Sequence, residues 1–257
     1  EDQLVPLQAR TLLLLGQTKK IVEELAKAPL NSAEAKADLQ TSVGRAYLAQ
    51  GNPDAAEAAF NAALTAVPEY GPAIFGQARI KASRRDLAGA LTLLDSVLEK
   101  NPAFHEGLQF KGDILALQGD AKAASETYLK VLTLRPDYLP AHASLISRHM
   151  ESGNLEEAGK QFEVMKKIAP SHPQTAYIQA ELLYRQKKFN EARESIQQHL
   201  KAIPDSVQGL QLAGAIEFEL KSYATAEKHL LAVLPKTVEL GLARRVLIAT
   251  YLRSGQP

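Results

Sequence analysis

The sequence lacks several features that would indicate an enzyme or a membrane-spanning protein. It has no cysteine, which excludes disulfides, thiolate metal sites and a cysteine nucleophile. No apolar run reaches the length of about 20 residues that a membrane-spanning helix needs. Glycine-rich phosphate-binding loops, the GxSxG serine motif and the HExxH zinc motif are all missing from the sequence. We therefore expect a protein that carries none of the common catalytic motifs.

The charge of the chain is almost balanced. The sequence has 30 basic and 29 acidic residues, which gives a formal net charge of +1. A nucleic-acid-binding domain normally has a basic excess, so we expect no nucleic-acid partner. Carboxylates are scattered, and adjacent pairs such as Glu23 and Glu24 point about 100° apart on a helix, too far apart to act as an acid–base pair. We predict that the protein is not an enzyme and binds no cofactor.

The histidines do not form a metal-binding pattern. His142 and His149 are seven residues apart and would share one helix face, but a zinc site needs further ligands and none lies nearby in the sequence. Both stand at positions that usually pack between helices, so we favour packing or surface roles and predict no metal site. His199 occupies a repeat position that is elsewhere alanine or valine, which predicts a packing role for it too.

A period of 34 residues runs through the chain. Five prolines keep this spacing: Pro68, Pro102, Pro136, Pro170 and Pro204. Six alanines keep it as well: Ala56, Ala90, Ala124, Ala158, Ala192 and Ala226. Glycines share a third series at Gly51, Gly119, Gly153 and Gly255, whose remaining positions hold Arg85, Lys187 and Lys221. Such strict spacing is the signature of a repeat protein.

Each repeat predicts two helices joined by a tight turn. Apolar residues between the glycine and the proline recur at helical spacing, and the proline ends that helix. Asn52 before Pro53 predicts a helix start, and Asn154 with Glu157 has the spacing of a capping box. A second series of small residues, broken at Ile146 and Ile248, lies in the preceding helix: Gly44, Ala78, Gly112, Ala180 and Gly214. Small residues in both helices allow a close approach, so the alanines should lie between them.

These residues resemble the tetratricopeptide repeat. In the first full copy the matching residues are Tyr47, Gly51, Ala56, Phe60, Ala63 and Pro68. The resemblance implies an all-α fold, a right-handed α-solenoid of tandem 34-residue helix–turn–helix repeats. We predict one array over residues 1–257, with units near 2–36, 37–70, 71–104, 105–138, 139–172, 173–206 and 207–240, and the first helix of a further unit at 241–257.

Three departures from the period carry their own predictions. Pro235 lies three residues ahead of the expected position at Val238, which predicts an early helix end and an irregular linker around 235–237. Gly16 lies 35 residues before Gly51, which predicts a longer loop within 28–37. Residues 240–253 predict a first helix whose apolar residues leave little room for a polar outer face. We therefore expect part of a longer array, whose exposed C-terminal helix can stack end to end on another copy.

The first helices of such repeats line the concave side, so a binding groove is expected there. Aromatic, charged and polar side chains at three repeat positions form the candidate peptide-binding groove: Arg45, Phe75, Arg79, Gln109, Asp113, Tyr177, Glu181, Tyr184 and Phe218. Such a groove suits an extended or helical segment of a protein partner. The Lys–Asn pair with which Hsp70- and Hsp90-binding members hold a terminal carboxylate is absent from the first helices, although Arg45 and Arg79 could serve an anion.

A narrower resemblance lies in residues 172–235, HPQTAYIQAELLYRQKKFNEARESIQQHLKAIPDSVQGLQLAGAIEFELKSYATAEKHLLAVLP, in residues 243–257, ARRVLIATYLRSGQP, and in QARTLLLLGQTKKIVEEL near the N-terminus. These stretches are similar to the repeat lipoprotein of exosortase/PEP-CTERM systems in Gram-negative bacteria. That resemblance implies a non-catalytic, exported protein of the periplasm or cell envelope, working in exopolysaccharide production and protein sorting. A lipid anchor outside this sequence would be its only membrane contact. The alternatives are the regulatory array of a larger enzyme such as a glycosyltransferase, and a cytoplasmic chaperone adaptor.

Overall fold

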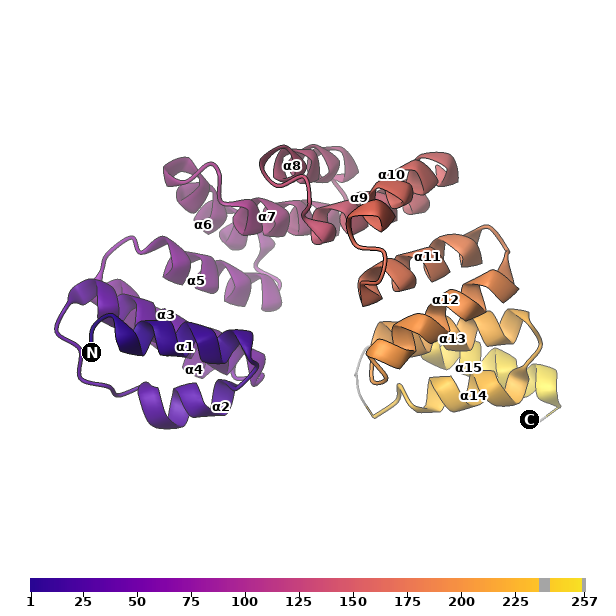
Figure 1. Cartoon of the computed structure of the whole chain (residues 1–257), viewed down its shortest axis with the longest axis horizontal. Helices are drawn as coiled ribbons and strands as arrows, with labels where there is room; N and C mark the ends of the chain where they lie inside the picture. The colour runs from indigo at the N-terminus through magenta and orange to yellow at the C-terminus, as the bar shows by residue number, and fades with distance from the viewer. Residues whose placement is uncertain (236–240, 256–257) are drawn as a thin grey trace. The chain divides into compact units, whose positions relative to one another are not determined.

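The computed structural model describes residues 1–235 and 241–255, and within these ranges it contains helices and no strand (Figure 1). The first helices of the hairpins are α1 (Leu4–Leu14), α3 (Ala33–Ala49), α5 (Gly71–Ser83), α7 (His105–Leu117), α9 (Leu139–Glu151), α11 (Pro173–Arg185), α13 (Val207–Glu219) and α15 (Gly241–Ser254). Their partners are α2 (Thr18–Lys20) with the π-helical segment η1 (Ile21–Leu25), α4 (Pro53–Ala66), α6 (Leu87–Lys100), α8 (Ala121–Leu134), α10 (Leu155–Ile168), α12 (Phe189–Ala202) and α14 (Tyr223–Leu231). The predicted all-α fold is confirmed.

The chain divides into two compact units, residues 1–134 and 135–257. In each unit the two helices of a hairpin pack together, and the second helix also packs on the first helix of the next hairpin. First helices additionally contact one another across hairpins, α3 with α5 in the first unit and α11 with α13 in the second. The first helices of neighbouring hairpins therefore form a shared surface within each unit.

The alanine series lies in the interior of the hairpins. All six alanines from Ala56 to Ala226 are 0% exposed, as the sequence predicted. Four residues later, a larger apolar side chain in each hairpin is also buried: Phe60, Leu94, Tyr128, Phe162, Ile196 and Leu230. Because positions four apart share one helix face, these two series form the buried face of each second helix. The small and the large residue together fix the spacing between the paired helices.

The large residue is accommodated by the small residues opposite it. A methyl group added at Gly44 on α3 or at Gly76 on α5 would lie within 3.0 Å of the Phe60 ring. The same holds for Gly112 against the ring of Tyr128. The ring of Phe60 thus occupies the space that is free because Gly44 and Gly76, on two different helices, have no side chain.

The repeated prolines end the second helices in the same way. Helices α4, α6, α8, α10 and α12 each stop two residues before the proline. The residue just before it leaves the helical region; Val67, for example, has φ −132° and ψ 100°. Proline disfavours the helical conformation in the residue before it because of a clash with its ring. The sequence therefore sets these helix ends directly.

The turn inside each hairpin needs one residue with left-handed backbone. Gly51, Gly119 and Gly153 have φ between 73° and 85°, and Arg85, Lys187 and Lys221 hold the equivalent turn with φ of 60–64°. The glycine series is therefore set by turn geometry, and a residue with a side chain adopts the same backbone at a cost.

Replacement of Lys187 by glycine is expected to raise the free energy of unfolding by up to about 1 kcal/mol, because glycine removes the left-handed penalty. As the control, Lys130→Gly within α8, where Lys130 is exposed, should lower it by about 1 kcal/mol. Urea unfolding of both variants measures the difference. If both variants changed the free energy of unfolding in the same direction, the left-handed backbone of Lys187 would not be the cause of the effect.

The departures from the period have structural counterparts. Helix α14 has 9 residues where α12 has 14, so the early helix end before Pro235 is confirmed, while the predicted linker at 236–237 lies outside the described residues. The longer N-terminal loop is confirmed but lies at 26–32, since α3 already begins at Ala33 inside the predicted connection. The π-helical segment η1 was not predicted, and it places Ile21, fully buried, at the position that alanine fills elsewhere.

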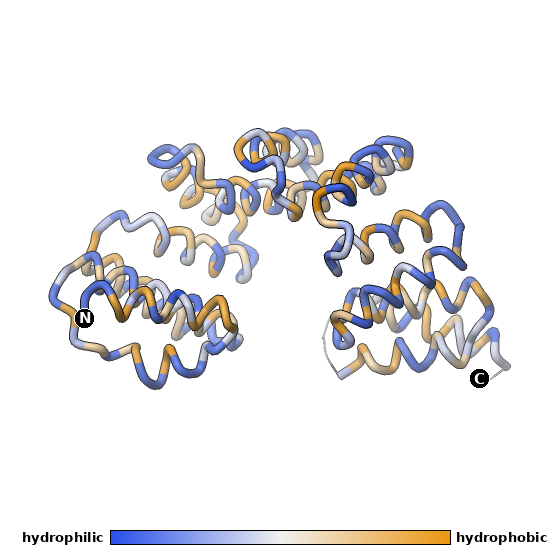
Figure 2. Tube along the Cα trace, viewed as in Figure 1, coloured by the Kyte–Doolittle hydropathy of each residue, from blue (hydrophilic) through white to orange (hydrophobic). Residues whose placement is uncertain are grey.

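The predicted C-terminal helix is present as α15, on which Ile248 and Leu252 are 59% and 71% exposed. Its stacking on another copy stays a prediction. Apolar and polar residues alternate along the helices (Figure 2). None of the described helices has both the length and the apolar character needed to cross a membrane.

Candidate functional site

The predicted groove residues are shared between the two compact units. The first unit holds Arg45 on α3, Phe75 and Arg79 on α5, and Gln109 and Asp113 on α7. The second unit holds Tyr177, Glu181 and Tyr184 on α11 and Phe218 on α13. All nine lie on first helices, and a continuous groove through both units stays a prediction.

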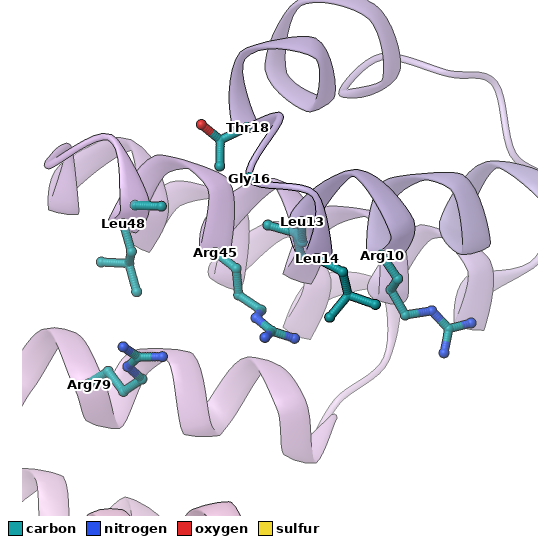
Figure 3. Close-up of a pocket in the computed structure, with 9 residues that line it drawn as sticks. Arg10, Leu13, Leu14, Gly16, Thr18, Arg45, Leu48 and Arg79 are labelled. Atoms are coloured by element: carbon teal, nitrogen blue, oxygen red, sulfur yellow. The ribbon is translucent and has the colours of Figure 1, made fainter. Parts of the chain in front are cut away.

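A pocket of about 600 Å³ lies on the first-helix side of the first unit, and it brings together two of the predicted residues, Arg45 and Arg79. Its lining comes from α1, the turn after α1, the start of α2, α3 and α5: Arg10, Leu13, Leu14, Gly16, Thr18, Arg45, Leu48, Ala49 and Arg79. In Figure 3 the side chains of Arg45 and Arg79 extend into the space between α3 and α5, with Leu13, Leu14 and Leu48 nearby. The pocket therefore combines guanidinium groups with leucine side chains.

The pocket is positively charged, because three of its nine lining residues are arginines and none is acidic. Arg10 is held at its edge by Asp38, with Nη2 3.2 Å from the carboxylate oxygen. Burial and, to a smaller extent, the charge of Arg45 lower the pKa of Arg79 below its usual value. The charge of Arg45 contributes to this shift, and a bound anion would oppose that contribution.

Sequence reasoning missed the contribution of α1, although a signal for it exists. Gly16 precedes Gly51 by 35 residues, and the same offset carries Arg10 onto Arg45 and Leu13 onto Leu48. Arg10, Arg45 and Arg79 therefore occupy one repeat position in three successive hairpins. Reading the N-terminal unit with its extra residue would have placed Arg10 in the site.

The other predicted residues of the first unit make contacts within the protein. The ring of Phe75 packs in T-shaped arrangements with the rings of Phe104 and Phe110, with centroids 5.0 and 5.8 Å away. Gln109 is buried, and its side-chain amide donates to the Asp113 carboxylate at 3.0 Å. The hydroxyl of Tyr128 donates to the same carboxylate at 2.9 Å. Asp113 thus links α7 to α8.

In the second unit the predicted aromatic side chains are half-buried and each contacts a ring on a second helix. Tyr177 lies against His199 and Tyr184 against Phe189, with centroids 5.4 and 5.7 Å apart. Phe218 pairs in the same way with a tyrosine of α14. Glu181 accepts a hydrogen bond of 3.3 Å from Arg185. These rings lie on first helices and pack against the second helices, and their place in a binding groove stays a prediction.

Tyr177 gives this surface a measurable property. Burial first, and the nearby Glu181 carboxylate second, raise the pKa of Tyr177 to about 12, against an opposing effect of Arg185. The folded chain keeps this proton to higher pH than the unfolded chain, where tyrosine titrates near about 10. The resulting stabilisation is complete below pH of about 10 and is lost as the pH rises through about 12.

Titration of tyrosinate absorbance is expected to show a component that ionises late, near the top of the accessible range, and Tyr177→Phe should remove it. The control is the chain unfolded in urea, in which the tyrosines should ionise together. A late component that persists in Tyr177→Phe would contradict the assignment to this residue.

The two buried histidines are structural. His199 Nδ1 donates to the carbonyl of Pro173 at 2.9 Å, and Nε2 accepts from the Ser206 hydroxyl at 2.8 Å. His142 Nε2 donates to the carbonyl of Pro136 at 2.8 Å, and Nδ1 accepts from the Gln161 amide at 2.6 Å. Both nitrogens of each ring are therefore engaged within the protein. Among the described residues no group of three or more histidine or acidic side chains could hold a metal ion.

Two family models match adjoining parts of the chain. A tetratricopeptide repeat model matches residues 47–114, and the model described as the second ARM domain of tetratricopeptide repeat protein 21 matches residues 106–218. The chain is built of tetratricopeptide repeats. No curated protein sequence matches it significantly.

Solved tetratricopeptide repeat structures share the fold. A chain of the APC/C hetero-tetramer Cut9–Hcn1 is 18% identical with a TM-score of 0.78, over 95% of this chain and 48% of that one. A tetratricopeptide repeat protein from Parabacteroides merdae is 17% identical with a TM-score of 0.70, over 97% and 98% of the two chains. For pilF of Pseudomonas aeruginosa the values are 19%, 0.63, 83% and 98%. The chain thus spans about half the length of the Cut9–Hcn1 component, and these identities show the fold alone.

Proposed function

We propose that this chain is a non-catalytic scaffold that binds a peptide or protein segment on the surface of its first helices. The observation that carries the proposal is the pocket in which Arg45 and Arg79, two of the residues predicted for the groove, come together beside leucines. Tetratricopeptide repeats are suited to protein–protein interaction, since stacked first helices present an extended surface that one hairpin lacks.

The first helices of the two units offer different contacts. In the first unit the guanidinium groups supply charge-assisted hydrogen bonds. In the second unit Tyr177 and Tyr184 supply half-buried rings, whose faces suit apolar or proline-rich segments. A segment would be held mainly by a few such anchors, while the remaining contacts exclude water.

The wider setting is part of the proposal. An exported, lipid-anchored protein of exopolysaccharide production and PEP-CTERM protein sorting is supported by the sequence resemblance of residues 172–235. Sequencing the parental gene on both sides would test it, because an export signal followed by a lipid-modified cysteine is expected upstream. A catalytic domain with a phosphate-binding loop beside the repeats would instead favour the regulatory array of an enzyme.

A displayed library of random peptides, selected on the whole immobilised chain, tests the binding function. We expect enriched peptides that bind the chain in solution and bind the Tyr177→Ala/Tyr184→Ala variant more weakly when they use the second unit. The matched control is Leu129→Ala/Val164→Ala, which removes exposed apolar side chains from the second helices α8 and α10 and should leave binding unchanged. A library that yields no specific peptide over repeated selections would overturn the proposal.

A further inference from the structure

Helix α1 has apolar residues on all of its sides, although only one side packs on the rest of the first unit. The packed side contacts α3 and η1 and places Ala9, Leu12 and Leu13 in the core of that unit. The opposite side carries four leucines that are between 55% and 89% exposed: Leu4, Leu7, Leu14 and Leu15. A helix that is apolar all round is normally buried on all sides. The exposed side of α1 therefore indicates a partner outside the single chain.

The exposed residues of α1 have the spacing of a contact between two helices. Four of them stand three, four and three residues apart, and we call them the α1 seam: Leu4, Leu7, Thr11 and Leu14. Paired helices use this spacing at the a and d positions of their contact. The spacing is the same when α1 is read from either end. The α1 seam therefore matches a copy of itself that runs in the opposite direction.

In such an antiparallel pair the leucines meet across the contact. Leu4 of one copy lies opposite Leu14 of the other, and Leu7 of one copy lies opposite Thr11 of the other, because both pairs are centred on residue 9. Leu15 extends the apolar area beside the seam. Each leucine that is exposed in the single chain would lose contact with water, which is favourable.

The polar residues of this region do not oppose the contact. The hydroxyl of Thr11 donates to the carbonyl of Leu7 in its own helix at 2.9 Å, so its hydrogen keeps a partner when the surface is covered. The α1 seam contains no charged residue. Arg10 beside it has its own counter-charge, with Nη2 3.2 Å from the Asp38 carboxylate. Two copies can therefore meet without burying an unpaired charge.

We propose that two copies of this chain form a dimer in which their α1 seams pack antiparallel about a two-fold axis. A two-fold interface needs a surface that is complementary to itself, and the α1 seam meets this condition through its spacing and its lack of charge. The inference goes beyond the proposed function and does not depend on it. If the dimer does not form, the scaffold proposal is unaffected.

The size of the contact predicts a weak dimer. An exposed leucine side chain offers on the order of 100 Å² of apolar surface, so four leucines from each of two copies bury roughly 800 Å². Stable protein–protein interfaces bury about 1,200–2,000 Å² in total. We therefore expect a dissociation constant of about 100 µM, and an association that does not weaken when salt is added, because no ion pair supports it.

Analytical ultracentrifugation of the whole chain tests the dimer over concentrations from about 5 µM to about 1 mM, a range that brackets the expected dissociation constant. Leu4→Ser/Leu7→Ser should weaken dimerisation at least about ten-fold, because each substitution is present in both copies. The matched control is Leu129→Ser/Leu134→Ser, which removes two exposed leucines of α8 and should leave dimerisation unchanged. Thermal unfolding verifies that each variant is folded.

The orientation of the two copies is tested with single cysteines, since the chain has none of its own. Gln8 and Gln3 are both exposed, but only Gln8 lies next to the centre of the antiparallel pair. The two copies of Gln3 would be separated by 12 residues along the helices, or about 18 Å, beyond the reach of a disulfide. Mild oxidation should therefore link the Gln8→Cys variant much faster than the Gln3→Cys variant. Equal rates would overturn the antiparallel arrangement.

The other results each have a definite meaning. A chain that stays monomeric up to about 1 mM, ten times the expected dissociation constant, overturns the proposal. So does a dimer that survives Leu4→Ser/Leu7→Ser, or one that dissociates when salt is added. Oligomers that grow beyond the dimer and disappear in Ile248→Ser/Leu252→Ser would assign the association to the exposed residues of α15 instead.

Discussion

Alanine in place of Gly76 is expected to lower the free energy of unfolding by about 2 kcal/mol. In an open helix the same replacement raises it by about 1 kcal/mol, because alanine has the higher helix propensity. The difference arises from the ring of Phe60, which is 0% exposed and lies within 3.0 Å of the place that the new methyl group would take. Neither the ring nor the backbone of α5 can move without opening the core of the first unit.

Two further variants make this prediction specific. Gly159→Ala on α10, where nothing lies within 4 Å of the new methyl group, should be stabilising. Leu94 fills the position of Phe60 in the next hairpin, so Phe60→Leu should restore part of the stability that Gly76→Ala removes. Urea unfolding of the two single variants and the double variant gives the coupling free energy. Additive effects would show that the ring and the glycine do not constrain each other.

Replacement of Glu217 by alanine is expected to cost about 3 kcal/mol of stability. Glu217 on α13 is 5% exposed, and both of its carboxylate oxygens accept hydrogen bonds from Arg193 on α12, at 2.9 and 2.5 Å. Arg193 also donates to the Ser222 hydroxyl at 3.0 Å. Removal of the carboxylate leaves the guanidinium partly buried without its counter-charge, and such a group is much more costly than an intact pair.

The matched control is Glu181→Ala, which removes a carboxylate paired with the more exposed Arg185 at 3.3 Å and should cost less than about 1 kcal/mol. Glu217→Gln keeps the shape and one hydrogen bond and should fall between the two alanine variants. Urea unfolding measures all three. Equal losses for Glu217→Ala and Glu181→Ala would show that burial of the Arg193 pair contributes nothing beyond a surface ion pair.

The sequence predicts the hairpins well because their constraints are local. Proline ends the second helices through a clash within two residues, and the buried alanines are marked by the period itself. The Arg193–Glu217 pair joins residues 24 apart on different helices, and no local pattern marks it. Neither the π-helical segment η1 nor the start of α3 at Ala33 could be derived, since one inserted residue can be absorbed by a loop or by a widened helix turn.

The candidate binding surface was predictable only in part. The repeat period places Arg45 and Arg79 on first helices, and the structure brings them into one pocket. The repeat period could not show that Phe75 packs on two other rings or that Gln109 is buried. Exposure depends on the sizes of neighbouring side chains from three helices, and spacing within one helix carries no information about them.

The repeat position shared by Arg10, Arg45 and Arg79 holds Asp113 in the fourth hairpin. The charge at this position therefore changes from positive to negative between the third and the fourth hairpin of the first unit. The two ends of this row of side chains differ in charge. If a partner binds along the first helices of this unit, as proposed, the change of sign favours the orientation that places its acidic end toward α3. Charged side chains at one repeat position are spaced by one hairpin. The charged groups of such a partner would then need a spacing equal to one hairpin or a multiple of it.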